Sequence, residues 1–442
     1  MHSNRESLLS LLKACTKSRD MKTGQEIHGR IVRMGLLKMD PFIGTSLVNM
    51  YAKCGSLSKA RSVLHELPAR DVVSWMAIIA GYVQHGQPEE ALYCFHIMQL
   101  DDGVSPDAIT FVYALKSCAN IKDICKGREL HNQIKRNSLQ HDLLVCTGLV
   151  DMYAKCGFLA KAKEVFDEIH TQDVVLWTSL IEGYLEHGYY EEVLDSFNRM
   201  QLEGVSLDTF TFMCGLKSCG NMATAKQGLQ IHARIQCKGF LEVDPIIGNV
   251  LVDMYAKCGQ VMNMAERAFD SLPSRDVISW TTLIGGYVDQ RCSKEAIKCF
   301  EQMQLEGILP NHVTFMYILK ACENTWVIRK GQKVHAQIEG MGLSERKPFI
   351  GNVLIDMYAK SGLLARSREV FENLHVRDVV SWTTLIIGYY EYGDDEEALN
   401  CFNAMQMEGV SPNTHTMVCI LRTCGSMVDL GKGLEIHTHM EK

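Results

Sequence analysis

A seven-residue phrase that recurs at a fixed interval constrains the fold of this chain more than any other feature. Its four copies share Met-Tyr-Ala-Lys and a final glycine, and they occupy residues 49–55, 151–157, 253–259 and 356–362. A second phrase, most often Asp-Val-Val-Ser-Trp, keeps the same interval at 71–75, 173–177, 276–280 and 378–382. Stacked units explain a constant interval, because each unit buries its apolar face against the next copy. We therefore expect function in a surface that recurs along the stack.

The interval divides into three kinds of unit, which we call long, short and standard. The long units are residues 5–40, 108–142, 209–244 and 312–347, the short units 41–71, 143–173, 245–276 and 348–378, and the standard units 72–107, 174–208, 277–311 and 379–413. We predict a single array over 5–442, with super-repeats 5–107, 108–208, 209–311 and 312–413 and a partial long unit at 414–442.

Each unit is predicted to contain two helices. Apolar residues follow helical spacing in the standard unit at 174–208, at Val175, Leu180, Ile181 and Tyr184. All nine prolines of the chain fall at joints between predicted helices, where a missing N–H is tolerated. Paired helices in units of this length predict an all-α fold, an α-solenoid of helix-turn-helix repeats with a concave and a convex side.

Composition and charge limit the classes of function. The net charge is −7 and the sequence pI is about 6.2, which is not the balance of a nonspecific nucleic-acid binder. No apolar run approaches the ~18–20 residues that a membrane helix needs. No Arg- and Ser-rich targeting segment is visible before the repeat that begins near Arg5.

The 17 cysteines are mostly repeat positions and contain no Cys-x-x-Cys pair. One series is Cys15, Cys118, Cys219, Cys322 and Cys424, and another is Cys54, Cys156 and Cys258, with Ser361 in the fourth copy. We interpret them as small, reduced thiols buried between helices, so that no metal or other cofactor is expected and a reducing compartment is.

The motifs together resemble one known family closely. Besides the two phrases, Leu-Lys-Ala-Cys occurs at 12–15 and 319–322, and Gly-x-x-x-His occurs at 24–28, 127–131, 228–232, 331–335 and 433–437. This pattern resembles the plant pentatricopeptide repeat family, in the PLS subclass that alternates long, short and standard repeats. The resemblance covers 5–442. It implies a right-handed superhelix that binds single-stranded RNA, with one base facing each repeat.

The resemblance also implies which side chains read the bases: the fifth residue of a unit and its last residue. In the short and standard units these pairs are Thr45/Asp71, Met76/Asp107, Thr147/Asp173, Thr178/Asp208, Asn249/Asp276, Thr281/Asn311, Asn352/Asp378 and Thr383/Asn413. Thr, Asn and Asp offer short polar groups to a base edge, whereas Met76 does not. A purely structural interpretation stays open, because Asp or Asn at the end of a unit is also a good N-cap for the next helix.

Two further sets of residues belong to the predicted interface. Aliphatic or aromatic second residues are expected to flank each base, and helix packing would explain them equally: Phe42, Val73, Leu144, Val175, Ile246, Ile278, Phe349 and Val380. Four lysines at the thirteenth place of the short units are candidate phosphate contacts, or simply solvated side chains: Lys53, Lys155, Lys257 and Lys360. The long units carry Leu9, Val112, Met213, Met316 and Val418 at the fifth place, and these apolar side chains cannot read a base edge.

The family's pairing preferences, carried over by position, predict the target G-N-n-G-G-n-U-A-n-U-A from 5′ to 3′, where n faces a long unit and N faces Met76. The resemblance implies a mitochondrial or chloroplast protein that marks a transcript site for C-to-U editing by a domain or a partner protein not in this chain. Two alternatives stay open, a protein–protein scaffold and RNA stabilisation or processing by occlusion.

We expect no enzyme in this chain and no catalytic residue. Zinc-dependent cytidine deamination needs a Cys-x-x-Cys pair among its ligands, and the sequence has none. The recurring His28, His131, His232, His335 and His437 are repeat positions and are interpreted as packed or capping histidines. The predicted partner is single-stranded RNA, with no membrane and no small-molecule substrate.

Overall fold

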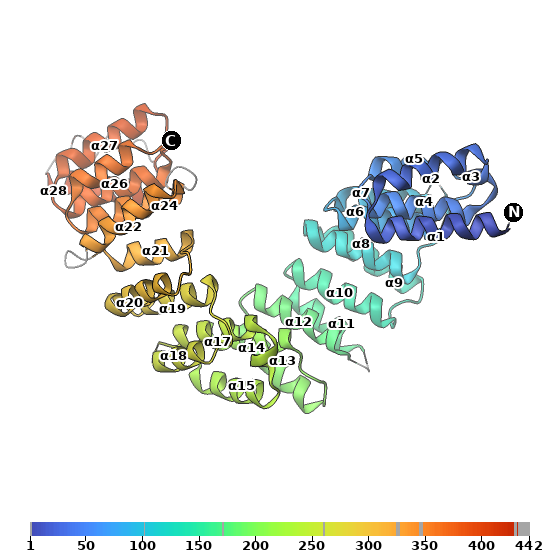
Figure 1. Cartoon of the computed structure of the whole chain (residues 1–442), viewed down its shortest axis with the longest axis horizontal. Helices are drawn as coiled ribbons and strands as arrows, with labels where there is room; N and C mark the ends of the chain where they lie inside the picture. The colour runs from blue at the N-terminus through green and yellow to red at the C-terminus, as the bar shows by residue number, and fades with distance from the viewer. Residues whose placement is uncertain are drawn as a thin grey trace. The chain divides into compact units, whose positions relative to one another are not determined.

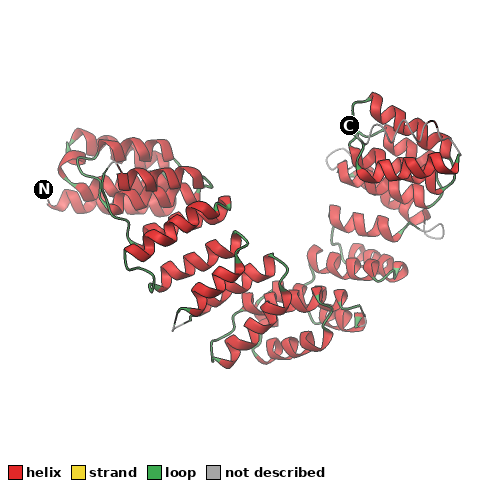
Figure 2. Cartoon of the chain, turned by 180° about the vertical axis from the view of Figure 1, so that it is seen from behind, coloured by secondary structure: helices red, strands yellow, loops and turns green. Residues whose placement is uncertain are grey.

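The computed structural model describes residues 2–100, 102–169, 172–259, 261–323, 328–343, 348–427 and 431. Within those ranges every regular element is a helix and there is no strand (Figure 2). The all-α fold predicted from the repeat pattern is confirmed. The terminal part of the predicted array, with His437, lies outside the described residues.

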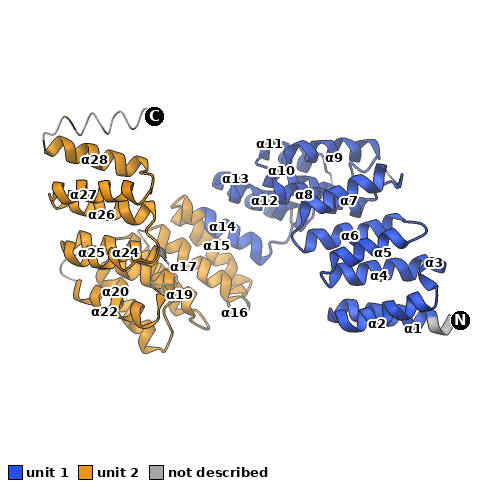
Figure 3. Cartoon of the chain, turned by 90° about the horizontal axis from the view of Figure 1, so that it is seen from above, with its two compact units in different colours: residues 1–218 blue, residues 219–442 orange. Residues whose placement is uncertain are grey.

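The helices fall into two compact bodies, residues 1–218 and 219–442 (Figure 3). The N-terminal body contains α1 (His2–Ser18), α2 (Met21–Arg33), α3 (Leu36–Met39), α4 (Pro41–Lys53), α5 (Leu57–Glu66), α6 (Val72–Gln84), α7 (Pro88–Leu100), α8 (Ala108–Ile121), α9 (Ile124–Arg136), α10 (Leu143–Lys155), α11 (Leu159–Asp167), α12 (Val174–Glu186) and α13 (Tyr190–Leu202). Helix α14 (Thr209–Asn221) begins in this body and ends in the next.

The C-terminal body repeats the arrangement. It contains α15 (Ala225–Cys237), α16 (Phe240–Val243), α17 (Pro245–Lys257), α18 (Met262–Asp270), α19 (Val277–Asp289), α20 (Ser293–Leu305), α21 (His312–Ala321), α22 (Ile328–Gly340), α24 (Pro348–Lys360), α25 (Leu364–Glu372), α26 (Val379–Glu391), α27 (Asp395–Met407) and α28 (Thr414–Ser426).

Each body has two layers of helices (Figure 1). In the N-terminal body α1, α4, α6, α8, α10 and α12 pack each against the next, and α2, α5, α7, α9, α11 and α13 each pack on one of them. In the C-terminal body the first layer is α17, α19, α21, α24, α26 and α28, covered by α15, α18, α20, α22, α25 and α27. Consecutive helices therefore alternate between layers, as paired-helix repeats require.

The recurring phrase forms the contact between each short unit and the standard unit after it. Its alanines, Ala52, Ala154, Ala256 and Ala359, are buried against the glycines Gly81, Gly183, Gly286 and Gly388 of the next first-layer helix. A Cβ atom on any of these glycines would lie only 2.4–2.7 Å from the alanine Cβ. Glycine is therefore required for the two helices to approach this closely.

The tyrosine of the same phrase joins the short unit to the long unit before it. Its hydroxyl lies 2.8–3.0 Å from Nδ1 of the histidine in Gly-x-x-x-His, in the pairs His28–Tyr51, His131–Tyr153, His232–Tyr255 and His335–Tyr358. Burial lowers the pKa of all four histidines, and that of His131 to about 4. The four are thus neutral packing residues at neutral pH, as the sequence indicated.

The cysteine series follow the same interfaces. Cys15, Cys118, Cys219, Cys322 and Cys424 are buried, and no disulfide joins the described cysteines. Cys258 Sγ lies 3.8 Å from the carbonyl oxygen of Cys219, and Ser361 Oγ donates at 3.1 Å to the carbonyl of Glu323 at the matching place. Cys258 and Ser361 thus each place a small side chain against the end of the neighbouring helix.

The residue after the first-layer helix of one standard unit differs in type from the matching residue of the other standard units, but it has the same backbone conformation. The first-layer helix of a standard unit is followed by Gly86, Gly188 and Gly393 in the first, second and fourth copies, with φ of 71–78°. Arg291 takes the same left-handed conformation in the third copy, with φ of 57°. Because side chains with a Cβ resist this region, packing of the surrounding helices imposes the turn on Arg291.

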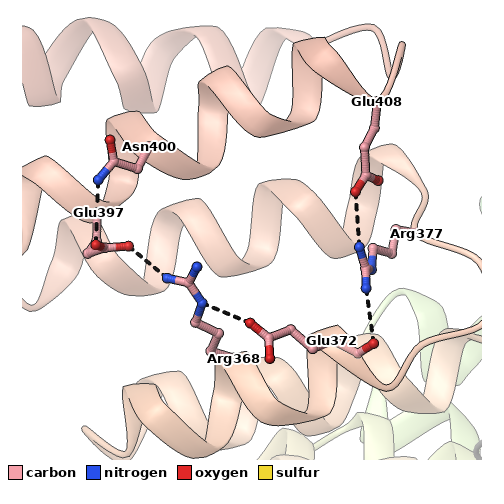
Figure 4. A network of polar contacts seen from close by, with 6 residues as sticks. All are labelled: Arg368, Glu372, Arg377, Glu397, Asn400 and Glu408. Atoms are coloured by element: carbon pink, nitrogen blue, oxygen red, sulfur yellow. Dashed lines mark hydrogen bonds and ion pairs between the residues drawn. The ribbon is translucent and has the colours of Figure 1, made fainter.

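Ion pairs tie neighbouring helices of the second layer together (Figure 4). Arg368 on α25 bonds Glu372 at 3.1 Å and reaches Glu397 on α27 at 2.7 Å. Arg377 Nη1 donates to Glu408 Oε1 at 3.0 Å, after the end of α27. The side chains of the Arg368–Glu397 and Arg377–Glu408 pairs are 30–46% exposed and reach solvent, so each pair adds at most about 1 kcal/mol.

The close helix contact predicts a specific cost for adding one methyl group. In Gly183→Ala the new Cβ meets the buried Ala154, whose own Cβ cannot rotate away, so we expect a loss of about 1–3 kcal/mol in unfolding free energy. Gly29→Ala, in the interior of α2 with nothing within 4 Å, is the control and should gain a few tenths to about 1 kcal/mol. Urea unfolding measures both, and a Gly183→Ala variant as stable as the control would contradict the contact.

Candidate nucleic-acid interface

The last residue of every short and standard unit is an N-cap. In all eight, the side-chain Oδ1 accepts a hydrogen bond at 2.8–2.9 Å from the backbone N–H three residues later, at Asp71, Asp107, Asp173, Asp208, Asp276, Asn311, Asp378 and Asn413. The structural interpretation left open by the sequence is therefore confirmed. A cap satisfies an N–H that the helix leaves without a partner.

The cap occupies only one of the two polar atoms of the side chain. Asp and Asn cap equally well, because both supply the Oδ1 acceptor. The second atom differs: in Asp it is an oxygen that accepts, and in Asn it is an NH₂ group that donates. The capping geometry thus holds a second polar atom at a reproducible place, and its hydrogen-bonding character changes with the residue.

The fifth residues lie on the first turn of the first-layer helices, and their hydroxyls are partly used by the backbone. Thr147 Oγ1 donates to the carbonyl of Leu143 at 2.8 Å, and Thr178 Oγ1 donates to that of Val175 at 2.9 Å. Thr45, Met76, Asn249 and Asn352 are half-buried. Thr281 and Thr383 are the most enclosed, with 7% and 6% of their surface exposed.

The structure links three predicted pairs. Asn352 Nδ2 lies 3.5 Å from Asp378 Oδ1. Thr281 and Asn311 are joined through Thr314, whose hydroxyl lies 2.7 Å from Thr281 Oγ1 and 3.1 Å from Asn311 Oδ1. Thr383, Thr416 and Asn413 repeat this chain at 2.6 and 2.9 Å. In the other five pairs the two side chains do not bond each other within the described residues.

The bridging threonines Thr314 and Thr416 were missed by the sequence reasoning. They are buried and follow the capping residue by three positions, as do the buried Thr110 and Thr211, and Ser74, Ser279 and Ser381 stand at this place in other copies. The recurring Asp/Asn-x-x-Ser/Thr pattern is a capping signal that was available in the sequence.

A pocket of about 370 Å³ opens beside one of the linked pairs. Its lining includes Thr281, Asn311, Ile278, Val313, Lys257 and Tyr317. Ile278 is the predicted flanking residue of this standard unit, and Val313 is the second residue of the long unit after it. One pocket therefore contains a reading pair, an apolar side chain from each of two neighbouring units, and a candidate phosphate contact.

The predicted flanking residues share one property that packing does not require. All eight are exposed, from 37% for Phe349 to 70% for Phe42, although each is large and apolar. The others are Val73, Leu144, Val175, Ile246, Ile278 and Val380. An exposed apolar side chain therefore recurs at the same place in each short and standard unit, where it can contact another molecule.

The candidate phosphate lysines are mostly neutralised by their own helices. Lys155, Lys257 and Lys360 each contact an aspartate one turn earlier at 2.8 Å, and Lys360 also contacts Glu323 at 3.2 Å. Lys53 has Asn49 at that place. A phosphate must compete with these carboxylates, so the lysines add less electrostatic attraction than their number suggests.

Two other kinds of functional element are absent from the part of the chain that the structure describes. No described helix is both long and apolar enough to cross a membrane. No group of three or more His, Cys, Asp or Glu side chains in the described ranges is placed to hold a metal ion.

The paired helices and capped units define a helical-repeat protein, and comparisons identify its class. A family model described as PPR repeat family matches residues 70–120, 172–221, 275–324 and 377–426, and one described as PPR repeat matches 45–72, 145–174 and 352–379. The crystal structure of the maize pentatricopeptide repeat protein PPR10 is similar with a TM-score of 0.67 at 19% identity, covering 98% of this chain and 68% of that one. PPR10 in complex with an 18-nucleotide psaJ RNA element gives 0.71 at 14% identity, over 93% and 61%.

The relatives in sequence are plant proteins. A chloroplastic pentatricopeptide repeat-containing protein of Arabidopsis thaliana is 32% identical over 98% of this chain and 69% of its own length. A mitochondrial one is 33% identical over 99% of this chain and 42% of its own length, and another chloroplastic one is 32% identical over 98% and 53%. This chain belongs to the pentatricopeptide repeat family.

The cap geometry predicts that the two polar replacements of one residue differ in stability. Asp173→Ala removes the acceptor for the Leu176 N–H and should cost about 1 kcal/mol, whereas Asp173→Asn keeps Oδ1 and should cost a few tenths at most. Urea unfolding of both variants beside the wild type measures the difference. Equal losses in the two variants would show that the side chain is not acting as a cap.

Proposed function

We propose that this chain binds single-stranded RNA sequence-specifically, with one base facing each short or standard unit. The observation that carries the proposal is the pocket that Ile278, Val313, Thr281 and Asn311 line together. Two apolar side chains suit the faces of a base, and polar groups at a fixed place suit its edge. The crystal structure of PPR10 in complex with an RNA element supports the same class of partner.

The free atom of the capping residue supplies a physical basis for base choice. Guanine and uracil present a ring N–H on the Watson–Crick edge, and adenine and cytosine present a ring nitrogen that accepts. The second oxygen of Asp therefore suits guanine or uracil, and the NH₂ of Asn suits adenine or cytosine. The cap holds either atom in the same place.

The fifth residue divides the guanine and uracil class further. Thr281 Oγ1 donates to the carbonyl of Val277 at 2.6 Å, so its remaining capacity is that of an acceptor, and Thr383 does the same with Val379. An acceptor suits an exocyclic amine beside the ring nitrogen, which guanine carries and uracil lacks; adenine and cytosine both carry one, so the choice of adenine rests on the family's pairing preference. An Asn amide instead donates and suits a uracil carbonyl. These assignments agree with the target G-N-n-G-G-n-U-A-n-U-A.

The finer assignments of subclass, compartment and purpose also belong to the proposal. The alternation of long, short and standard units supports the PLS subclass. Relatives named chloroplastic and mitochondrial support an organellar location, and this chain spans 42–69% of the lengths of the three relatives described above. We propose that the bound transcript is a C-to-U editing substrate, with the chemistry supplied by a domain or partner protein outside these residues.

The proposal predicts binding to an 11-nucleotide RNA of the target sequence in preference to a version with adenine at the three guanine positions. We expect roughly tenfold or greater discrimination, because each mismatch leaves a polar group without a partner. A gel-shift titration of both RNAs at one salt concentration measures it.

One control variant and two contrary outcomes separate the possible failures. Asn249→Thr should move the preference at the seventh base from uracil toward guanine and leave the other positions unchanged. Equal affinity for the two RNAs would contradict base reading, and absence of binding to either would contradict the RNA-binding function itself.

A further inference from the structure

Tyr317 lines the pocket of the Thr281/Asn311 pair, and no step of the base reading uses it. It lies on α21 four residues after Val313, just as Gly285 lies on α19 four residues after Thr281. Both are thus one helical turn, about 6 Å, from the reading level toward the C-terminal ends of their helices.

Gly285 allows the phenol of Tyr317 to lie against α19. A Cβ atom on Gly285 would be 2.9 Å from Tyr317 Cζ, the carbon that carries the hydroxyl, and 3.0 Å from Cε2. The hydroxyl is therefore held beside the helix backbone directly below Thr281. No group among the described residues lies within hydrogen-bond distance of it, so it is available to a molecule in the pocket.

The groups around the phenol keep it protonated. Burial raises the pKa of Tyr317, the charges of Asp289 and Asp253 raise it further, and Lys257 opposes them. The hydroxyl is accordingly a hydrogen-bond donor as well as an acceptor at neutral pH. Asp253 and Asp289 also line this end of the pocket.

The lining residues of the pocket suit the base, the ribose and the phosphate of one nucleotide in turn. A base between Ile278 and Val313 meets Thr281 and Asn311, and the candidate phosphate contact is Lys257, at the C-terminal end of α17. The ribose joins base to phosphate, so it must pass the level of Gly285 and Tyr317.

We propose that the Tyr317 hydroxyl binds the ribose 2′-hydroxyl of the nucleotide read by Thr281 and Asn311, and so makes this position selective for RNA over DNA. The 2′-hydroxyl is the group that distinguishes the two nucleic acids at a given site. The inference rests on the proposed RNA-binding function and adds a residue that contacts the sugar.

The chain contains its own control for this assignment. The pair Thr383/Asn413 is identical, but Cys419 and Ile387 stand where Tyr317 and Gly285 do. Both pairs are assigned adenine, at the eighth and eleventh bases of the target. They differ in the phenol and in the glycine that makes room for it, and also in three other lining residues, since His415, Val380 and Glu391 stand where Val313, Ile278 and Asp289 do.

The test compares the 11-nucleotide RNA with versions that carry one 2′-deoxyribose, at the eighth or at the eleventh position. We expect the wild-type chain to lose about fivefold in affinity for the first version and to bind the second as it binds the all-ribose RNA. Tyr317→Phe keeps the ring, should lose about fivefold with all-ribose RNA, and should show no further loss with the eighth-position deoxyribose.

A second variant addresses the geometry of the phenol. In Gly285→Ala the new Cβ displaces the ring from α19, so the variant should also become insensitive to the sugar at the eighth position. If the wild type binds base-specifically but with equal affinity for the all-ribose RNA and both deoxyribose versions, the inference is overturned and the proposed function stays intact. Absence of RNA binding would overturn both.

Discussion

The hydrogen bond that starts the first-layer helices of the standard and long units is the interaction on which the rest of this structure depends. The Asp or Asn at the end of each short and standard unit accepts the backbone N–H three residues later, as Asp173 does from Leu176 at 2.8 Å. The cap fixes where the next helix begins, so it also fixes where the second and fifth residues of the following unit lie. It uses one polar atom of the side chain and holds the other in place. Under the proposed function, structural and recognition roles are therefore combined in one residue rather than alternatives to each other.

Packing between units keeps these capped helices in a constant register. The contact of Ala154 with Gly183 brings α10 and α12 close together, and the bond between His131 and Tyr153 joins α9 to α10. These contacts recur in every described super-repeat, with the same residue types. The capping, fifth and second residues vary between units while these contacts stay the same. Under the proposed function, the residues that set the geometry are therefore separate from those that set the base preference.

Much of the fold was predictable because the repeat multiplies each local signal. The glycine that ends each short-unit helix, the buried tyrosine and the small thiol were identified from one phrase. The partners of these residues could not be predicted. Gly183 and His131 are distant in sequence from Ala154 and Tyr153, and only the stacking of the helices brings each pair together. At the interface, the use of the Asp and Asn residues as caps was only one of two interpretations of the sequence, and their use in base reading stays a prediction. Tyr317 escaped prediction because it belongs to a long unit and acts through Gly285 of the preceding one.

The most direct test of this dual role is a change in the free atom of one cap with the cap itself retained. Asn311→Asp keeps the Oδ1 that accepts from Thr314 at 2.9 Å and converts the NH₂ donor into an acceptor. Affinities for RNAs with adenine or guanine at the eighth position, measured together with the free energy of urea unfolding, report both roles. We expect the preference to move from adenine to guanine while the unfolding free energy stays within a few tenths of a kcal/mol of the wild type. An unchanged preference for adenine in a stably folded variant would contradict the dual role.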